Sequence, residues 1–338
     1  MAFTSVLENK TYDMVSDDVD SSYSVVKHLN AHCYSSDVDT FAISLSGGVD
    51  SMVIATIIKK LGFHVICAHI NYNNREESTL EADFLRNWTH ANKIEFFYKN
   101  IEDFKRGDMN RHEYEEVTRD IRFDLYKEML STTEATSIIL GHHDDDIIEN
   151  VINNVCKGRN ILDLTVMQKE SQMFGVDLSR PLIGLRKSDV YDFANSYNVP
   201  YFKDTTPDWS LRGIFRRQLF PIIERTYNGA AKNILLVSKQ SDEWGEFINS
   251  HIISPLMEES VFAETHTIIP FAKYRTYPEC FWKHVLTTIF HKYSLGALSL
   301  KSLRNLMTHF TKMPPVKVQL TNNVRAEITN DHITLFYN

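Results

Sequence analysis

Two adjacent glycines, Gly47 and Gly48, join an apolar stretch to an amphipathic one, and this junction constrains the fold more than any other feature of the chain. Residues 41–45 have the composition of a buried strand. Residues 50–61 place apolar side chains at helical spacing, and Gly62 is positioned to end the helix. Glycines let the backbone approach a bound group, and the first N–H groups of a helix have no partner inside it. The junction therefore predicts a phosphate-binding loop at the end of a strand in an α/β sheet.

The loop differs from the P-loop of common nucleoside triphosphatases, which has a lysine after its glycines. Here Asp50 follows, and its carboxylate would repel a bare phosphate, so we expect Mg²⁺ between Asp50 and the phosphates. The hypothesis is a site that binds ATP and cleaves it between the α and β phosphates, with Asp50 also catalytic. Its binding residues are Ser46, Gly47, Gly48, Val49, Asp50 and Ser51. The competing interpretation is a strand–turn–helix in which the glycines only relieve strain.

Strands and helices are expected to alternate beyond the loop. The predicted strands span 64–70, 95–98 and 137–140, and the predicted helices span 77–91, 112–130, 144–156 and 187–197. Such alternation is typical of βαβ units, so the predicted fold class is α/β, a Rossmann-like parallel sheet with helices on both faces. After a polar loop, the pattern predicts a helical stretch at 212–251, an irregular one at 255–278, helices at 281–293 and 299–310, and strands at 316–320, 325–328 and 332–336.

The length of 338 residues favours more than one domain. We expect a partly ordered, acidic and serine-rich extension at 1–37, an ATP-binding catalytic domain at 38–225, and a smaller helical and α+β domain at 226–338. The net charge of −8 argues against broad, non-specific nucleic-acid binding, although it is compatible with a local basic patch that holds one RNA.

The cysteines match no zinc or iron–sulfur spacing, so reduced thiols in a cytoplasmic protein are expected. They are Cys33, Cys67, Cys156 and Cys280. No apolar run reaches the ~18 residues that a membrane span needs, and residues 1–20 contain no secretory signal. We therefore expect no membrane association. The oligomeric state is left open, with a homodimer as one option.

The loop resembles the signature of the N-type ATP pyrophosphatases, the PP-loop superfamily that includes GMP synthetase, NAD synthetase, asparagine synthetase and several tRNA-modifying enzymes. Members form an acyl- or imidoyl-adenylate and release pyrophosphate. Further segments resemble one branch, the tRNA-isoleucine lysidine synthetases. These segments are 69–78, similar to H-x-x-x-x-x-R-x-x-S; 115–123, similar to E-x-x-A-R-x-x-R-Y; 141–150, similar to A-H-H-x-D-D-Q-x-E-T; and Arg180-Pro181-Leu182 with Asp204, 212–216 and Pro221, similar to R-P-L…E-D…R-N-x-I-R…P. The tail, 298–336, resembles the family's second domain more weakly.

The resemblance implies an enzyme that uses ATP and Mg²⁺ to adenylate the C2 oxygen of the wobble cytidine in a CAU-anticodon isoleucine tRNA. The ε-amine of lysine then displaces AMP to give lysidine, so tRNA and lysine are the implied partners, and the C-terminal domain is expected to contact tRNA. The chain departs from the pattern at Ile147, Asn150, Gly213 and the loop that begins at Asp204. Two alternatives therefore stay open: a tRNA thiolase, which the isolated cysteines disfavour, and a diverged pseudoenzyme that retains ATP or tRNA binding.

Asp146 and Glu149 are three positions apart on a predicted helix, so both carboxylates face one side, just beyond the carboxyl end of a strand. There they are placed to hold a substrate amine or Mg²⁺, or to take a proton from an ammonium nucleophile, and we interpret both as catalytic. The alternative is a solvated acidic helix N-terminus, which the helix dipole also favours.

We assign His69 and His142 to the nucleotide. One histidine of the pair His142 and His143 is expected to contact the nucleotide and the other to support the turn, and a satisfied structural histidine is an equal alternative. A metal site formed by the histidines and the neighbouring Asp145 and Asp146 is a weaker alternative, because it would need ligands from other segments.

Arginines are the remaining candidates. Arg119 and Arg122 share a helix face and are predicted to grip phosphate or a substrate carboxylate, Arg119 in a catalytic role and Arg122 as a substrate ligand. Their alternative is an exposed surface paired with Glu115 and Glu116. A dense basic segment is predicted to contact RNA backbone or ATP phosphates, or else is a solvated run of charge. It comprises Arg212, assigned a catalytic role, Arg216 and Arg217, assigned to substrate, and Arg225.

Overall fold

The structure is a computed structural model that describes residues 7–9, 11–14, 18–74, 77–102, 104, 107–165, 167–203, 206 and 208–337. The contacts of the chain divide it into two compact units. Unit 1 comprises Met1–Cys156 and Thr165–Ser238, and unit 2 comprises Lys157–Leu164 and Lys239–Asn338. The division falls inside helix α9 (Ala230–Ile248), whereas the sequence analysis begins the second domain at residue 226.

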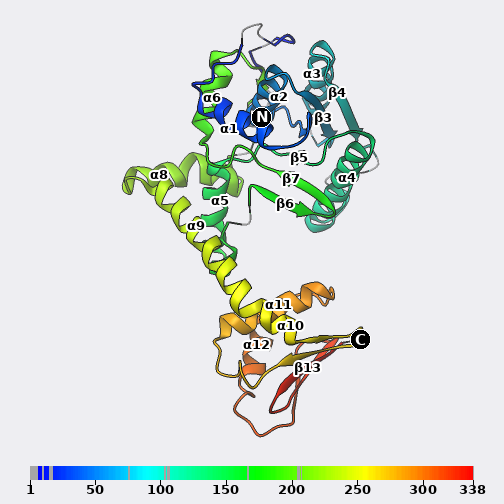
Figure 1. Cartoon of the computed structure of the whole chain (residues 1–338), viewed down its shortest axis with the longest axis vertical. Coiled ribbons are helices and arrows are strands. Elements are labelled where there is room, and N and C mark those ends of the chain that lie inside the picture. The colour runs from blue at the N-terminus through cyan, green and yellow to red at the C-terminus, as the bar shows by residue number, and fades with distance from the viewer. Residues whose placement is uncertain are drawn as a thin grey trace. The chain divides into compact units, whose positions relative to one another are not determined.

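A six-stranded sheet with the order β4-β3-β2-β5-β7-β6 forms the centre of unit 1 (Figure 1). All its neighbouring strands pair in parallel except β6 and β7, which are antiparallel. The bounds are β2 Thr40–Ser44, β3 His64–Asn71, β4 Glu95–Asn100, β5 Ile138–Ile139, β6 Glu170–Met173 and β7 Val176–Ser179. The sequence analysis contains no β6–β7 hairpin. Its turn residues, Phe174 and Gly175, have φ angles of +51° and +77°, as a two-residue hairpin turn requires.

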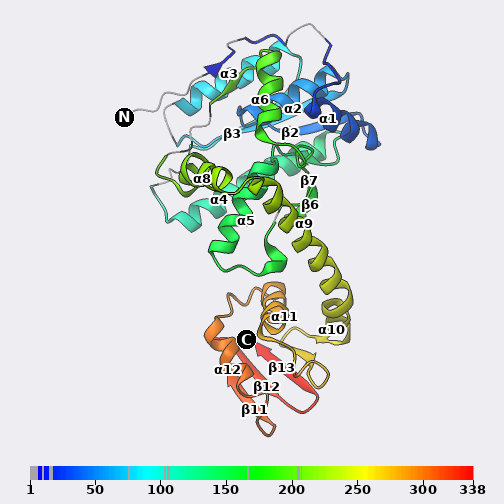
Figure 2. The ribbon, with the colours of Figure 1, turned by 90° about the vertical axis from the view of Figure 1, so that its left-hand side faces the viewer.

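Helices cover both faces of this sheet, which confirms the predicted fold class. Helices α1, α2, α3 and α6 pack on the face to which Ile43 and Val65 point. Helix α4 packs on the opposite face with Ala42 and Ile66. The bounds are α1 Ser24–Ser35, α2 Val49–Lys60, α3 Glu77–Ala91, α4 Arg111–Thr132, α5 Asp144–Cys156 and α6 Lys187–Ser196. Figure 2 shows α6, α2 and α1 gathered at β2 and β3.

The N-terminal extension contributes to the core of unit 1. Helix α1 buries four side chains that share one face, namely Val25, Val26, Leu29 and Cys33. Further upstream, β1 (Leu7–Glu8) pairs antiparallel with β8 (Tyr201–Phe202). The acidic and serine residues that suggested only partial order lie outside this apolar face, so the composition of 1–37 concealed a helix that packs on the sheet.

The predicted helical stretch at 212–251 is several helices. It contains α7 Leu211–Ile214, a π-helical turn Phe215–Leu219, α8 Phe220–Thr226, α9, and a second π-helical turn Asn249–Ile253 that leads into α10 Ser254–Glu259. The chain leaves the helical conformation after α8, and Gly229 in the turn has a φ of +78°. Phe215, Phe220 and Ala231 form a small core with Ile148 of α5, which fixes this segment beside α5.

Unit 2 contains an antiparallel five-stranded sheet with the order β11-β12-β13-β10-β9 and helices α11 and α12 packed on it. The bounds are β9 Val261–Phe262, β10 His266–Pro270, α11 Glu279–Lys292, α12 Leu300–Met307, β11 Val316–Gln319, β12 Val324–Ile328 and β13 His332–Tyr337. The sequence analysis leaves 255–278 irregular and misses α10, β9 and β10, because β10 pairs with the distant β13. None of the helices in the described part of the chain is long and apolar enough to span a membrane.

Candidate active site

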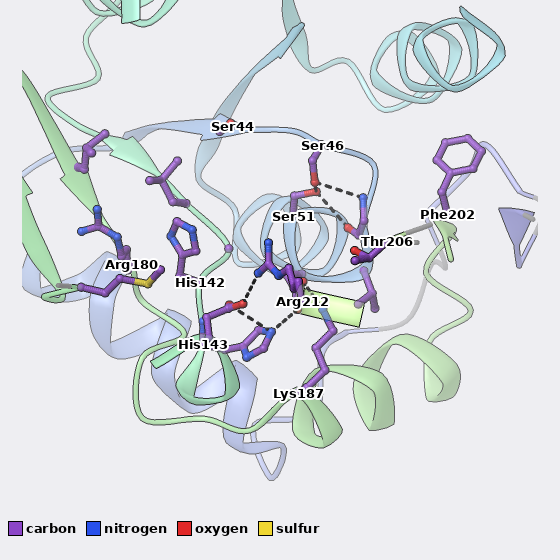
Figure 3. Close-up of a pocket in the computed structure, with 18 of the residues that line it drawn as sticks. Ser44, Ser46, Ser51, His142, His143, Arg180, Lys187, Phe202, Thr206 and Arg212 are labelled. Atoms are coloured by element: carbon purple, nitrogen blue, oxygen red, sulfur yellow. Dashed lines mark hydrogen bonds and ion pairs between the residues drawn. The ribbon is translucent and has the colours of Figure 1, made fainter. Parts of the chain in front are cut away.

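The predicted phosphate loop connects β2 to α2, and Gly48 directly precedes the helix. Its hydroxyl groups surround the helix start (Figure 3). Ser46 Oγ lies 3.2 Å from Ser51 Oγ and accepts a hydrogen bond from the Gly48 N–H at 3.3 Å. Ser51 donates to the Gly48 carbonyl at 3.0 Å. These bonds order the first turn of α2, whose N–H groups and dipole favour an anion.

Gly47 joins the loop to β8. Its φ is +81°, and its carbonyl accepts a hydrogen bond from the Phe202 N–H at 2.9 Å. A Cβ atom at Gly47 would lie 3.0 Å from Phe202 Cδ2 and 3.4 Å from Leu85 Cδ1. Both the backbone conformation and the available space therefore require glycine at this position.

We expect Gly47→Ala to lower the free energy of unfolding by about 1–3 kcal/mol, because alanine must hold a positive φ, and to weaken ATP binding. Gly62→Ala is the matched control, since Gly62 has a φ of +92° but nothing within 4 Å of an added Cβ. Gly62→Ala should lower the free energy of unfolding through backbone strain but leave the affinity for ATP unchanged. Urea unfolding and ATP titration provide the measurements. An ATP affinity equal to that of the wild type in Gly47→Ala would contradict the assignment of this loop.

A cavity of about 670 Å³ adjoins the loop at the carboxyl ends of the parallel strands, where open α/β sheets bind ligands. Residues from α4, α5, α6 and segment 206–216 complete its wall. The polar and charged residues that line it include Ser46, Asp50, Ser51, Arg122, Tyr126, His142, His143, Asp146, Arg180, Lys187, Lys203, Arg212 and Arg216. The structure thus brings together most of the predicted site residues, although they are widely spread along the chain.

Asp50 faces two basic side chains. Lys187 Nζ lies 2.5 Å from Oδ2, and His143 Nε2 lies 3.8 Å from Oδ1. Asp50 Oδ1 is buried and has no hydrogen-bond partner among the described residues. An unpaired carboxylate oxygen beside a phosphate loop fits Mg²⁺, which proteins often hold with one or two carboxylates and the substrate phosphates. The described residues contain no cluster of three or more histidine, cysteine or acidic side chains that could hold a metal ion by itself.

Asp146 and Glu149 lie on one face of α5, and both carboxylates bind arginines. Asp146 Oδ1 lies 2.7 Å from a terminal nitrogen of Arg212 and 2.7 Å from one of Arg216. Glu149 accepts a hydrogen bond from Arg216 Nε at 2.8 Å and lies 3.3 Å from Arg212 Nε. We call these four residues the charged cluster. Its two negative and two positive charges balance, which allows the Asp146 side chain to be only 6% exposed.

The surroundings of Asp146 determine its ionisation. Burial opposes the charged form, but the nearby His143, Arg212 and Arg216 outweigh burial and hold the pKa of Asp146 below its usual value. Asp146 is therefore a carboxylate at neutral pH. It becomes a better proton acceptor only if the arginines move away from it.

His142 and His143 have different surroundings. His143 is 2% exposed, and its backbone N–H donates to Asp146 Oδ2 at 3.2 Å. The imidazole ring of His143 lies between the carboxylates of Asp50 and Asp146. It supports the turn before α5, as predicted. His142 lines the cavity, and its Nδ1 is buried without a hydrogen-bond partner among the described residues. Burial lowers the pKa of His142, so its ring is neutral at pH 7 and available to a ligand.

His69 lines a second cavity of about 360 Å³, together with Ser44, Tyr72 and Arg122. Its Nδ1 lies 2.8 Å from the Leu45 carbonyl. A carbonyl only accepts, so Nδ1 carries the proton and Nε2 is the acceptor. Burial lowers the pKa of His69 as well. The second cavity could thus receive a hydrogen-bond donor from a nucleoside next to the phosphate loop.

The lowered pKa values of His69 and His142 predict a pH dependence of stability. Near pH 6 and below, the unfolded chain binds protons on these histidines that the folded chain excludes, so the free energy of unfolding should fall as the pH decreases from 7.5 to 5.5. Urea unfolding of unit 1 should show a smaller fall in the double variant His69→Gln/His142→Gln. His90→Gln, which changes an exposed histidine on α3, should leave the fall unchanged. An identical pH dependence in the double variant and the wild type would refute the prediction.

The predicted arginines divide into two groups. Arg122 lines both cavities and forms no hydrogen bond or ion pair with another described residue, whereas Arg212 and Arg216 belong to the charged cluster. Arg119 lies outside both cavities, over the ring of Phe174 at 4.7 Å and 3.3 Å from Asp120. Its place on the same helix face as Arg122 did not bring it to the site, because the aromatic turn of the β6–β7 hairpin holds it.

The remaining basic residues also lie away from the cavities. Arg217 contacts the Thr206 carbonyl and Asp208, and Arg225 is exposed at the end of α8. Two motif positions quoted above, Arg75 and Asp204, lie outside the described residues.

Sequence reasoning assigned no role to three cations of the cavity, Arg180, Lys187 and Lys203. Arg180 is 5% exposed and donates to the Gln168 carbonyl and to Ser171 Oγ, each at 2.8 Å, while its Nε has no partner among the described residues. An arginine directly after a buried strand was a signal for it. Lys187 lies against Asp50. The absence of a lysine from the loop was a signal to look for a cation elsewhere in the chain.

Comparison with known proteins decides the family. Residues 21–223 match the family model ATP_bind_3, described as a PP-loop domain. The chain belongs to this PP-loop family. The matched region contains the loop, both cavities and the charged cluster, and membership implies the use of ATP. The predicted membership of the PP-loop superfamily is therefore confirmed, and it favours a phosphate-binding loop at the two glycines over a strand–turn–helix without a ligand.

Several curated relatives of this PP-loop protein carry the name tRNA(Ile)-lysidine synthase. A tRNA(Ile)-lysidine synthase from Chlamydia muridarum is 24% identical over 285 residues, which cover 83% of this chain and 88% of that protein. A tRNA(Ile)-lysidine synthase from Enterococcus faecalis is 25% identical over 280 residues, which cover 81% of this chain and 60% of that longer protein. The resemblance noted in the motifs thus extends beyond the loop into the second half of the chain.

A solved structure supports the fold. The U34-tRNA thiolase NcsA from Methanococcus maripaludis, determined with its [4Fe-4S] cluster, matches with a TM-score of 0.50 and 19% identity, over 68% of this chain and 78% of that protein. Among the described cysteines here, Cys33 and Cys67 are buried, and Cys156 and Cys280 are exposed. No described group of three such side chains is arranged for a metal, so the thiolase alternative fits less well.

Proposed function

We propose that this PP-loop protein is a ligase that forms lysidine at the wobble cytidine of a CAU-anticodon isoleucine tRNA and converts ATP to AMP and pyrophosphate. The observation that carries the proposal is a single cavity lined both by the phosphate loop and by Asp146, Arg212 and Arg216 of the charged cluster, so that a phosphate site and a buried carboxylate border the same space. Glu149 is not among the residues that line this cavity and meets the same arginines beside it. The name tRNA(Ile)-lysidine synthase, which both relatives described above carry, supports the choice of tRNA and lysine.

In the first step, the C2 oxygen of cytidine attacks the α-phosphorus of ATP. The bond between that phosphorus and the bridging oxygen breaks, and pyrophosphate leaves with the electron pair. The hydroxyls of Ser46 and Ser51 and the N–H groups at the start of α2 are placed to stabilise the leaving group. Mg²⁺ held by Asp50 would neutralise part of its charge. His69 and His142, as neutral rings, are assigned to the nucleotide.

In the second step, the ε-nitrogen of lysine attacks C2, the C2–O bond breaks, and AMP leaves with that oxygen. The ε-ammonium loses one proton before the attack and a second as the product forms. We assign Asp146 and Glu149 to hold the ammonium and to accept these protons. Arg212 and Arg216 compete for the same carboxylates. Phosphates of ATP or tRNA that draw the guanidinium groups toward themselves would raise the pKa of Asp146 and free it for the amine.

Incubation of the protein with labelled lysine, ATP, Mg²⁺ and total tRNA, followed by nucleoside analysis, tests the proposal. We expect label in a single modified nucleoside and pyrophosphate release that requires both lysine and tRNA. For variants of the charged cluster, Asp83→Asn is the control, because Asp83 also pairs with an arginine, Arg86 on α3, but its side chain is 51% exposed. Absence of label from RNA would refute lysidine formation.

The same experiment separates the alternatives. Intact ATP binding without turnover, at any combination of lysine and tRNA, would favour a pseudoenzyme. Transfer of labelled sulfur rather than lysine into tRNA would favour a thiolase.

A further inference from the structure

Lys187 brings a positive charge to a phosphate loop that has no lysine of its own. It is the first residue of α6, its Nζ lies 2.5 Å from Asp50 Oδ2, and 137 positions of sequence separate the two residues. Its side chain is 25% exposed and lines the large cavity next to Ser46 and Ser51. Figure 3 shows Lys187 extending from α6 toward the start of α2.

The backbone beneath Lys187 is fixed by the start of α5. The Gly184 N–H donates to Asp144 Oδ1 at 2.8 Å, and the Lys187 N–H donates to Asp145 Oδ2 at 2.8 Å. Arg186 forms a second set of bonds to Asp145, at 2.8–3.1 Å. These contacts fix the position of the Lys187 backbone. Among the residues that the structure describes, the ammonium lies closest to the Asp50 carboxylate, with the Tyr191 ring centre 5.7 Å away.

The second observation concerns the other oxygen of the same carboxylate. Asp50 Oδ1 is buried and has no hydrogen-bond partner among the described residues, so Asp50 has an acceptor left for a cation in addition to Lys187. A lysine side chain is flexible and carries a compact charge that can move between neighbouring acceptors. The loop hydroxyls of Ser46 and Ser51 line the same cavity as Lys187 and Asp50.

We propose that Lys187 is the phosphate-binding cation of this loop, supplied from α6, and that Asp50 holds it until Mg²⁺ takes the carboxylate. The ligand class is a diphosphate: the β and γ phosphates of ATP and the pyrophosphate released from it. Paired with Asp50, the lysine contributes no net charge. Once Mg²⁺ binds Asp50, the three groups together carry two positive charges beside the leaving group. The inference rests on the ATP site of the proposed function and is independent of lysine and tRNA.

Binding of inorganic pyrophosphate, measured by calorimetry with Mg²⁺ or with EDTA, tests the proposal without turnover. With Mg²⁺, Lys187→Met should bind pyrophosphate about 10- to 100-fold more weakly than the wild type, as expected for the loss of a charge-assisted hydrogen bond. Lys187→Arg should bind more tightly than Lys187→Met. Lys127→Met is the matched control, since Lys127 also pairs with an aspartate, Asp124 at 4.0 Å on α4, but lines neither cavity, and it should bind like the wild type.

The EDTA arm distinguishes a phosphate ligand from a structural ion pair. Asp50→Asn removes the partner of Lys187, so this variant should bind pyrophosphate without metal more tightly than the wild type. The double variant Asp50→Asn/Lys187→Met should lose that gain, and it also leaves no unpaired charge to disturb folding. The role proposed for Lys187 would be overturned if the double variant kept the gain, or if Lys187→Met bound pyrophosphate with normal affinity. Neither result would affect the assignment of the ATP site. A wild-type protein that binds neither pyrophosphate nor ATP would overturn the ATP site itself.

Discussion

Asp146→Asn should reduce lysidine formation by about 10²- to 10⁴-fold, the range over which a positioned acid or base contributes to catalysis. Asparagine keeps the shape of the side chain and an oxygen that can accept a hydrogen bond from Arg212 or Arg216. It removes the negative charge that would attract the lysine ammonium and accept its proton. Asp146 is almost completely buried and lines the cavity, whereas Glu149, which meets the same arginines, does not line it.

The measurement is single-turnover transfer of labelled lysine to tRNA, with ATP affinity determined in parallel. We expect ATP affinity to change far less than the rate, since Asp146 lies in the charged cluster and not in the phosphate loop. Asp83→Asn should behave like the wild type in both assays. A rate for Asp146→Asn close to that of the wild type would remove Asp146 from the reaction and leave it a purely structural role.

Leu29→Ala should lower the free energy of unfolding of unit 1 by about 2–5 kcal/mol, a large part of the 5–15 kcal/mol that stabilises a typical protein. Leu29 is fully buried on α1 and packs in the same core as α2 and α6, the helices that carry Asp50 and Lys187. The variant should therefore be less stable although the change lies in the acidic N-terminal extension.

Urea unfolding followed by circular dichroism measures this effect. Lys27→Ala is the control, because it makes a substitution on the exposed side of the same helix, and its midpoint should match that of the wild type. If Leu29→Ala unfolded at the wild-type urea concentration, α1 would not contribute to the core as its burial indicates.

The sequence predicted the elements whose patterns are local. The strand, the two glycines and the amphipathic helix of the loop are neighbours in the chain, and the motif at 141–150 includes a histidine turn and Asp146 within a few positions. Periodicity and turn chemistry are sufficient for such segments. The same reasoning predicted the parallel sheet, because strands and helices alternate regularly along unit 1.

Features that depend on distant pairing could not be predicted in this way. The β9 and β10 strands are short and gain their identity from β13. The turn at Gly229 is different, because the pair Asn228-Gly229 is a local turn signal that the predicted helical stretch passed over. In the site, helix periodicity placed Arg119 and Arg122 together, but only the β6–β7 hairpin shows which of them reaches the cavity. The partners of Asp50 and Asp146 come from segments whose register with the sheet no local pattern reveals.

The ion pair between Asp50 and Lys187 has a consequence for the newly synthesised chain. The two residues are 137 positions apart, so at about 5–20 residues per second the ribosome adds Lys187 roughly 7–27 s after Asp50. During that interval the first strands and helices can associate, yet the acidic loop still lacks its cation. A chain that terminates early would thus carry a recognisable PP-loop sequence but an incomplete diphosphate site. Premature fragments of this protein should therefore be poor competitors for cellular ATP.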